Sequence, residues 1–318
     1  MSQLFRDVEG KAICPQGSVV CIGAFDGLHR GHQALVGHAR ERAREFDLPL
    51  VALSFEPLPR EYFAGEAPPP RLSLPRAKFE GLRALGADRV GLLRFDAHLA
   101  AMTAEAFIET VLVRRLAVRE VWVGPEFRFG RQRRGDLALL QAQGVKHGFA
   151  ANEIAPVTAD GERVSSSRLR LLLAAGEIDA ASHALGRRYA ISGRVVRGKQ
   201  LGRKLGYPTA NLRLAGKRPA LGGIFAAWVH GVGAERIAGV ASLGTRPTVF
   251  GTEPLLEAHL FDFDGDLYGQ RIEVEFVTKL RDEEKFADLP ALVQQMNIDS
   301  DNARRALRHD LEERGVLA

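Results

Sequence analysis

The feature that most constrains this chain is a buried-looking apolar run that ends in a glycine-rich turn with two histidines. The run Ser18-Val19-Val20-Cys21-Ile22 has the length and composition of a buried strand. It leads into Gly23-Ala24-Phe25-Asp26-Gly27-Leu28-His29-Arg30-Gly31-His32, and a helical pattern follows from residue 31 to 46. A strand, turn and helix in this order direct the free amides of the helix N-terminus, and both imidazoles, at an anion held in the turn.

Strand and helix patterns alternate through the first half of the chain. Further strands are predicted at 49–55, 89–95, 118–123 and 149–154. Helices are predicted at 104–116, 136–143 and 165–185, and Thr103 is the expected N-cap of the first of them. This alternation predicts an α/β fold with a parallel, doubly wound sheet. Ligands of such sheets bind beyond the carboxyl ends of the strands, where residues 23–32 would lie.

The second half is rich in strand patterns. Strands are predicted at 189–196, 224–229, 237–242, 255–261 and 272–278, and the glycine-rich breaks between them indicate a small barrel or sandwich. Residues 289–313 return to a helical pattern, for which Asp299-Ser300-Asp301 is the predicted start signal. The joint is placed at Gly186-Arg187-Arg188, which predicts domains at 1–186 and 187–318.

Charge and composition limit the classes of molecule that this chain is expected to bind. The net charge is +5, with 36 arginines against 8 lysines, and arginine offers a planar fork that suits phosphate oxygens. The arginines are spread along the chain, which favours phosphorylated small molecules over nucleic acid. No apolar run approaches the ~18 residues that span a bilayer, the start shows no signal-peptide core, and two cysteines make no disulfide framework. We expect a cytoplasmic protein that binds neither membrane nor nucleic acid.

The first turn has the residue types that phosphate chemistry needs. Gly23, Gly27 and Gly31 let the backbone approach a triphosphate closely. His29 and His32 can donate hydrogen bonds to phosphate oxygens and stabilise a pyrophosphate leaving group. A substrate phosphate can attack the nucleotide α-phosphate in line, so no side-chain nucleophile is required. Two histidines alone could equally be surface residues or metal ligands, and the whole ten-residue pattern favours catalysis.

This turn resembles the signature of the HxGH nucleotidylyltransferases, and more specifically the N-terminal domain of the bacterial FAD synthetases, which are bifunctional riboflavin kinases and FMN adenylyltransferases. Phe55-Glu56-Pro57-Leu58-Pro59-Arg60 resembles the family's flavin-side loop. Val123-Gly124-Pro125-Glu126-Phe127-Arg128-Phe129-Gly130 resembles its nucleotide-side loop. Val164-Ser165-Ser166-Ser167-Arg168-Leu169-Arg170 resembles its mobile phosphate-closing element, although alone it would pass for a serine-capped helix.

The resemblance implies a Rossmann-like N-terminal domain and assigns roles within it. The implied catalytic residues are His29, His32 and Arg170. Nucleotide binding falls to Gly23, Phe25, Asp26, Gly31, Gly124, Ser166 and Ser167, and flavin binding to Phe55, Pro57, Pro59 and Arg60. The sequence departs from the family pattern at Ala24, where Asn is frequent, at Leu58, where His is frequent, at Glu126, where Asp or Asn is usual, and at Ser167, where Thr is usual.

A second signature lies in the strand-rich half, at Leu205-Gly206-Tyr207-Pro208-Thr209-Ala210-Asn211. Thr209 Oγ and the Asn211 carbonyl are hard oxygen donors suited to Mg²⁺, although these residues are also common in plain turns. The segment resembles the riboflavin kinase signature Gly-x-Pro-Thr-Ala-Asn, and segments 239–248, 255–263, 267–269 and 280–286 resemble later parts of that domain.

The second resemblance implies a riboflavin-kinase-like β-barrel with terminal helices, in which Thr209 and Asn211 bind the metal. It places Gly198 and Arg203 at the nucleotide and Arg281 at the flavin. The family's catalytic base aligns with Glu257.

Strand geometry bears on that base. Period-two alternation puts Glu257 and His259 on the face opposite Leu256, Ala258 and Leu260. A carboxylate there could take the proton of a ribityl hydroxyl that attacks a γ-phosphate. The spacing alone would suit an ordinary solvated glutamate.

The resulting hypothesis is a bifunctional enzyme of flavin-cofactor synthesis. Riboflavin and ATP–Mg²⁺ would give FMN and ADP, and FMN with a second ATP would give FAD and pyrophosphate. Two alternatives remain at this stage. One is another HxGH transferase that acts on pantetheine phosphate or nicotinamide mononucleotide. The other is a flavin-binding or nucleic-acid-binding module without catalysis.

Overall fold

The computed structural model describes residues 3–65, 68–198, 202, 205–248 and 251–314. The chain divides into two compact units by its internal contacts. The first unit comprises Met1–Pro69 and Pro75–Ser165, and the second comprises Pro70–Leu74 and Ser166–Ala318. The domain boundary at 186/187 stays a prediction.

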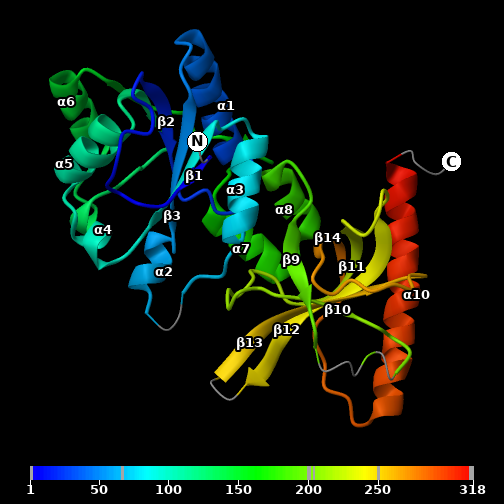
Figure 1. Ribbon diagram of the computed structural model, residues 1–318. Coiled ribbons are helices and arrows are strands. Elements are labelled where there is room, and N and C mark those ends of the chain that lie inside the picture. Colours follow the sequence, from blue (N-terminus) through cyan, green and yellow to red (C-terminus); the bar gives the residue numbers. More distant parts are fainter. Residues whose placement is uncertain (1–2, 66–67, 199–201, 203–204, 249–250, 315–318) are drawn as a thin grey trace. The chain divides into compact units, whose positions relative to one another are not determined.

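The first unit is built on a parallel sheet, as the alternating pattern predicted (Figure 1). Within the described residues the sheet has six strands in the order β1-β4-β3-β2-β5-β6, and every neighbouring pair is parallel. The strands are β1 (Leu4–Phe5), β2 (Ser18–Ile22), β3 (Leu50–Glu56), β4 (Arg89–Arg94), β5 (Val118–Val123) and β6 (Ala150–Glu153). The strand order reverses between β2 and β5, so the ligand crevice is expected at the carboxyl ends of these two strands.

Helices cover both faces of this sheet. The larger helical elements are α1 (Arg30–Glu45), α3 (Pro75–Ala84), α5 (Ala104–Phe107) with the π-helical segment Ile108–Arg115, and α6 (Leu137–His147). Alternate residues of β2 and β3 enter two separate apolar cores, one shared with α1 and α3 and the other with α5, the π-helical segment and α6. The shorter elements are α2 (Pro59–Phe63), α4 (Ala97–Ala101), the 3₁₀ turn Arg131–Arg133 and the hairpin of β7 (Thr158–Ala159) and β8 (Glu162–Arg163).

The second unit contains a closed antiparallel barrel, which decides between the barrel and sandwich alternatives (Figure 1). In the part of the chain that the structure describes, the barrel order is β10-β13-β12-β11-β14-β9. The strands are β9 (Ala190–Val196), β10 (Ala210–Leu212), β11 (Gly223–His230), β12 (Ile237–Thr248), β13 (Gly251–Leu260) and β14 (Arg271–Arg281). Helix α10 (Leu289–Glu313) packs Ala303 and Leu307 against Trp228 and Phe261 of the barrel.

Two predicted helix signals were wrong. The stretch 165–185 is two helices, α7 (Ser166–Ala175) and α8 (Ile178–Leu185), because Gly176 between them has φ +81°. Helix α10 begins after Asp288, whose carboxylate accepts a hydrogen bond from the Ala291 amide at 2.8 Å. Asp299 lies within the helix and is buried, so it is not a start signal. The predicted cap at Thr103 is confirmed, since its hydroxyl accepts from the Ala106 amide at 3.2 Å.

Candidate active sites

The histidine turn joins β2 to α1 at the reversal point of the sheet. His29 is the N-cap of α1, with extended backbone dihedrals of φ −68° and ψ 169°. Its Nδ1 accepts a hydrogen bond from the backbone amide of His32 at 3.3 Å. The cap therefore satisfies one of the free amides of the helix start and fixes the orientation of the His29 ring.

The same hydrogen bond determines where the proton of His29 lies. Burial lowers the pKa of His29 to about 4, so the ring is neutral at pH 7. Because Nδ1 accepts the His32 amide, the single proton of the neutral ring is on Nε2. His29 therefore presents one Nε2–H donor, which suits a phosphate oxygen.

His32 lies directly against His29. The two rings stack with their centroids 3.6 Å apart, and Phe25 meets the His32 ring edge-on at 5.3 Å. Burial first, then His29 and Lys78, hold the pKa of His32 well below its ordinary value. Its buried Nδ1 has no hydrogen-bond partner among the described residues. A buried polar atom of this kind is normally satisfied, and a bound substrate would supply the partner.

The predicted nucleotide-binding residues near the turn are of two kinds, buried side chains and glycines. Phe25 and Asp26 are almost completely buried, and the Phe25 ring contacts the His32 ring edge-on. The glycines allow close approach: a Cβ on Gly31 would lie 3.2 Å from His29 Nδ1, and one on Gly23 would lie 3.2 Å from the Phe25 ring. Gly124, just after β5, has nothing within 4 Å of its Cβ position in the described structure. Their contacts with nucleotide stay predictions.

The predicted phosphate-closing element opens α7. Ser166 and Ser167 are the first two residues of this helix, and Arg170 lies one turn later. Arg170 Nε donates to the carbonyl of Pro70 at 2.7 Å, so part of its guanidinium is already bound within the second unit. Val164, two residues before α7, belongs to the first unit, where its carbonyl lies 3.9 Å from the Cβ position of Gly31. The roles of Ser166, Ser167 and Arg170 remain predictions.

The flavin-side loop follows the carboxyl end of β3. Phe55 is half-buried, Pro57 follows a cis peptide bond, Pro59 is the first residue of α2 and Arg60 is exposed. The departure at Leu58 has a structural account. Leu58 is buried as the N-cap of α2, and its amide donates to the Glu61 carboxylate at 2.9 Å.

Sequence reasoning missed the aromatic residues around this loop. Phe95 meets Phe55 edge-on at a centroid distance of 5.9 Å, and it also contacts Tyr62 at 5.3 Å and Phe63 at 5.8 Å. Phe63 is 68% exposed and Tyr62 is 39% exposed. The available sequence signal was the adjacent pair Tyr62-Phe63 soon after a substrate loop, and in the structure these residues belong to a contiguous aromatic patch of the kind that marks binding sites.

The departure at Glu126 also has a local account. Glu126 has φ +61°, a left-handed conformation that Asn and Asp adopt more readily. Its carboxylate pairs with Arg163 of the β7–β8 hairpin at 2.7 Å. Because both side chains are exposed, this ion pair contributes little stability.

The second candidate site lies where β10 meets β13. Thr209 Oγ1 donates to Glu257 Oε1 at 3.2 Å, and Asn211 is the register partner of Glu257 across the two strands. The predicted alternation of β13 is confirmed, since Leu256 and Ala258 are fully buried and Glu257 is half-buried. The structure therefore brings the predicted base and both predicted metal ligands together.

Two neighbours shape this second site. A Cβ on Gly198 would lie 2.6 Å from Asn211 Oδ1, so glycine leaves the space that the amide occupies. His259 Nδ1 lies 2.9 Å from the carbonyl of Pro208 and donates to it, which fixes the turn that carries Thr209. Arg203 lies outside the described residues.

The donor chemistry of this site fits Mg²⁺. No group of three or more His, Cys, Asp or Glu side chains suited to a metal occurs in the described residues. Thr209 and Asn211 instead offer neutral oxygens, and Mg²⁺ commonly combines few protein oxygens with water and nucleotide phosphates.

Arg281, predicted to bind flavin, is bound within the protein. Its Nη2 donates to Asp299 Oδ2 at 2.7 Å and its Nε to Asp299 Oδ1 at 2.9 Å. Its Nη1 donates to the carbonyl of Asp282 at 2.9 Å. A flavin contact by Arg281 stays a prediction.

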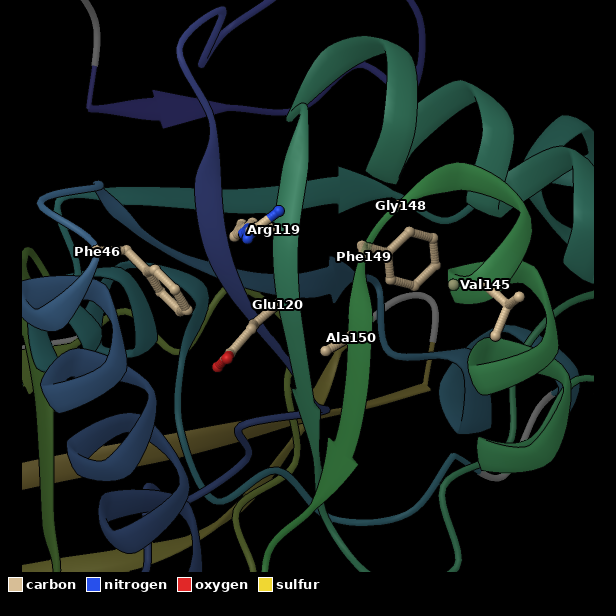
Figure 2. Close-up of a pocket in the computed structure, with 8 residues that line it drawn as sticks. Phe46, Arg119, Glu120, Val145, Gly148, Phe149 and Ala150 are labelled. Atoms are coloured by element: carbon tan, nitrogen blue, oxygen red, sulfur yellow. The ribbon is translucent and has the colours of Figure 1, made fainter.

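A further cavity of about 340 Å³ lies at the amino ends of β5 and β6, away from the histidine turn (Figure 2). Phe46, Glu120, Val145 and Phe149 line it, with Arg119, Gly144, Gly148 and Ala150. Glu120 is already paired with Arg42 at 2.6 Å. This cavity contains none of the predicted site residues.

Comparison with known proteins assigns a family to each half of the chain. Residues 11–168 match the family model of FAD synthetase, and residues 185–307 match that of riboflavin kinase. The matched region of the first unit thus carries a nucleotidyl-transfer fold and the barrel carries a kinase fold, which defines a two-domain transferase of flavin cofactors.

Relatives extend the match over nearly the whole chain. The chain is 43% identical to the bifunctional riboflavin kinase/FMN adenylyltransferase of Escherichia coli (strain K12), over 95% of this chain and 97% of the relative. It is 44% identical to the protein of that name from Pseudomonas fluorescens, with the same two coverages. The chain belongs to the bifunctional riboflavin kinase/FMN adenylyltransferase family.

Among solved structures, the fold is similar to one described as a macrolide-efflux protein from Streptococcus pneumoniae. That structure is 28% identical, has a TM-score of 0.77, and covers 94% of this chain and 99% of its own. In the described part of the present chain, every helix is too short or too polar to cross a bilayer.

Proposed function

We propose that this chain performs both reactions in its family's name, with residues 1–186 transferring AMP to FMN and residues 187–318 phosphorylating riboflavin. The two family models support this division, because one ends at residue 168 and the other begins at residue 185. The observation that carries the proposal is the presence of two chemically distinct polar clusters, the stacked His29 and His32 rings at the start of α1 and the Thr209–Glu257 pair of the barrel.

Adenylyl transfer is assigned to the turn. A phosphate oxygen of FMN attacks the α-phosphorus of ATP, the bond to the bridging oxygen breaks, and pyrophosphate leaves with that electron pair. The Nε2–H of His29 and the start of α1 stabilise the growing negative charge. His32 and the amides around Gly31 hold the triphosphate, and the family resemblance assigns phosphate binding to Ser166, Ser167 and Arg170 as well.

Riboflavin phosphorylation is assigned to the barrel. Glu257 takes the proton of the ribityl hydroxyl as its oxygen attacks the γ-phosphorus of ATP, and ADP leaves. The Thr209 hydroxyl, 3.2 Å from Glu257, orients that carboxylate. Mg²⁺ held by Thr209 and Asn211 neutralises charge on the nucleotide phosphates when it is bound.

The aromatic residues near the flavin-side loop are assigned to the isoalloxazine ring of FMN. Phe63 and Tyr62 expose ring surface next to Phe55 and Phe95. A planar flavin ring can stack on such surface and cover it from water. Phe55, Pro57, Pro59 and Arg60 of the loop are assigned to the same flavin.

The decisive experiment separates the two activities on one chain. Pure protein is incubated with riboflavin, ATP and Mg²⁺, and the flavins are resolved by chromatography. His32→Ala is expected to abolish FAD while FMN accumulates. Glu257→Gln is expected to lower riboflavin phosphorylation by about 10²–10⁴-fold, with FAD still formed from supplied FMN. If either variant loses both activities, the assignment to independent sites is wrong.

The same assay tests the rival substrates. Pantetheine phosphate and nicotinamide mononucleotide are supplied in place of FMN, and neither is expected to accept AMP. The cytoplasmic location and the lack of binding to membrane or nucleic acid remain proposals, which cell fractionation and a nucleic-acid binding titration would test.

A further inference from the structure

Helix α3 packs directly beneath the histidine turn and carries a buried lysine toward it. Gly81 of α3 leaves room for Leu28, whose Cδ1 would lie 2.3 Å from a Cβ at that position. Lys78 lies three residues before Gly81, on the same side of the helix, and is completely buried. A lysine is almost never fully buried unless its ammonium has specific partners.

The ammonium of Lys78 bonds to the carboxyl end of one strand, β3. Its Nζ donates to Ser54 Oγ at 3.3 Å and to the carbonyl of Phe55 at 3.5 Å, both at the carboxyl end of β3. Ser54 Oγ in turn donates to the carbonyl of Ala24 at 3.0 Å. Ala24 is the second residue of the nucleotide turn, and Phe55 is the first residue of the flavin-side loop. One side chain therefore connects the starting points of both substrate loops.

The charge of Lys78 also reaches the reacting groups. Lys78 is one of the groups that hold the pKa of His32 low, after burial and His29, so its ammonium lies within electrostatic range of that imidazole. Burying an ammonium costs free energy that an apolar side chain of similar length would avoid. In adenylyl transfer two anionic phosphates must approach each other, and a buried cation within electrostatic range of the site lowers their repulsion.

We propose that Lys78 is a positioning residue for adenylyl transfer: through Ser54 and the Phe55 carbonyl it sets the spacing of the nucleotide turn and the flavin-side loop, and its buried ammonium adds positive charge at the base of both loops. This inference rests on the assignment of adenylyl transfer to the histidine turn. Lys78 lies within the region that matches the FAD synthetase family model, and the proposal is argued from its contacts with Ser54 and Phe55.

The test compares three variants in the full-length chain. Lys78→Met keeps the length of the side chain and removes the charge, and Lys78→Arg keeps the charge. Leu82→Ala is the matched control, because Leu82 lies one turn further along α3, is completely buried and belongs to the apolar core. Riboflavin phosphorylation by the same polypeptide reports that the second unit is intact.

For Lys78→Met we expect kcat for FAD formation from FMN and ATP to fall about 100-fold, because misplaced reactants lose the advantage of proximity. The KM values for both substrates should change less than about threefold, and calorimetric titration should give the same number of FMN sites per chain as in the wild type. Lys78→Arg should recover at least about a tenth of the wild-type kcat, since the charge is restored. Leu82→Ala should lower Tm without this loss of kcat.

Three outcomes would overturn the proposal: a kcat loss in Leu82→Ala equal to that in Lys78→Met at the same Tm, a rise in KM with kcat unchanged, or no recovery in Lys78→Arg. Should Lys78→Met fail to bind FMN because the first unit is unfolded, Ser54→Ala gives the answer. It is expected to lower kcat about tenfold while the first unit stays folded at the assay temperature, and an unchanged kcat would count against the proposal. Retention of FAD synthesis in His32→Ala would instead refute the assignment of the site itself.

Discussion

Replacing His29 by Asn should make the first unit less sensitive to acid. His29 is 6% exposed and burial lowers its pKa from 6.5 to about 4. Between these two values the unfolded chain holds a proton on His29 that the folded chain does not hold. The free energy of unfolding therefore rises with pH through this window. The contribution of the neutral His29 ring to this free energy is fully present above about pH 6.5 and is lost as the pH falls toward 4.

The size of the effect follows from the two pKa values. At about 1.4 kcal/mol per pH unit, the gap between 6.5 and about 4 costs the folded state roughly 3 kcal/mol by pH 4. His29→Asn removes the titrating ring and keeps a side chain that caps helices well. The variant should consequently differ from the wild type by a constant amount above pH 7, and lose about 3 kcal/mol less between pH 7 and pH 4.

The chain provides a natural reporter for this measurement. It has two tryptophans, Trp122 in β5 of the first unit and Trp228 in β11 of the second. Urea unfolding followed by fluorescence in a Trp228→Phe background reports on the first unit through Trp122. The titration is repeated at pH 8, 7, 6, 5 and 4 for two chains of this background, one that keeps His29 and one that carries the His29→Asn substitution. Parallel pH profiles for the two chains would refute the buried neutral imidazole and, with it, the Nε2–H donor to phosphate.

Two further predictions concern the barrel. His259→Phe keeps an aromatic ring but loses the hydrogen bond to the Pro208 carbonyl. We expect the KM for ATP–Mg²⁺ in riboflavin phosphorylation to rise roughly fivefold, because one hydrogen bond is lost. An unchanged KM would show that the turn carrying Thr209 does not need this hydrogen bond. Gly198→Ala should displace the Asn211 amide, 2.6 Å from the new Cβ, and abolish riboflavin phosphorylation while FAD formation from FMN continues. Gly233→Ala is the matched control, since nothing lies within 4 Å of its Cβ position in the described structure, and equal losses in both variants would contradict the reasoning.

Local sequence patterns predicted those strands and helix caps that depend only on neighbouring residues. The apolar run 18–22 became β2 with the predicted bounds, and Thr103 caps its helix through its own hydroxyl. The helix start assigned to Asp299 was wrong because that carboxylate is buried by Arg281, which is remote in sequence and reaches it from β14. The break at Gly176 was missed, since a glycine inside a helical pattern does not reveal its φ of +81°.

Local sequence patterns also predicted only part of the candidate sites. Thr209, Asn211 and Glu257 were predicted as a group and do lie together, because strand pairing places a β10 residue opposite a β13 residue. Lys78 could not be predicted, since its position in the helical segment 75–84 resembles that of any solvated lysine. Only the tertiary contact of α3 with the end of β3 distinguishes it.

The short segment Pro70–Leu74 affects how this protein can be divided and made. It lies inside the sequence of the first unit but belongs to the second, where the Arg71 amide donates to the Arg218 carbonyl at 2.7 Å. A single cut in the gene therefore cannot release the barrel with all its native neighbours. During translation, more than a hundred residues are synthesised after this segment before its partner Arg218. The second unit can therefore complete its folding only after most of the polypeptide has been translated.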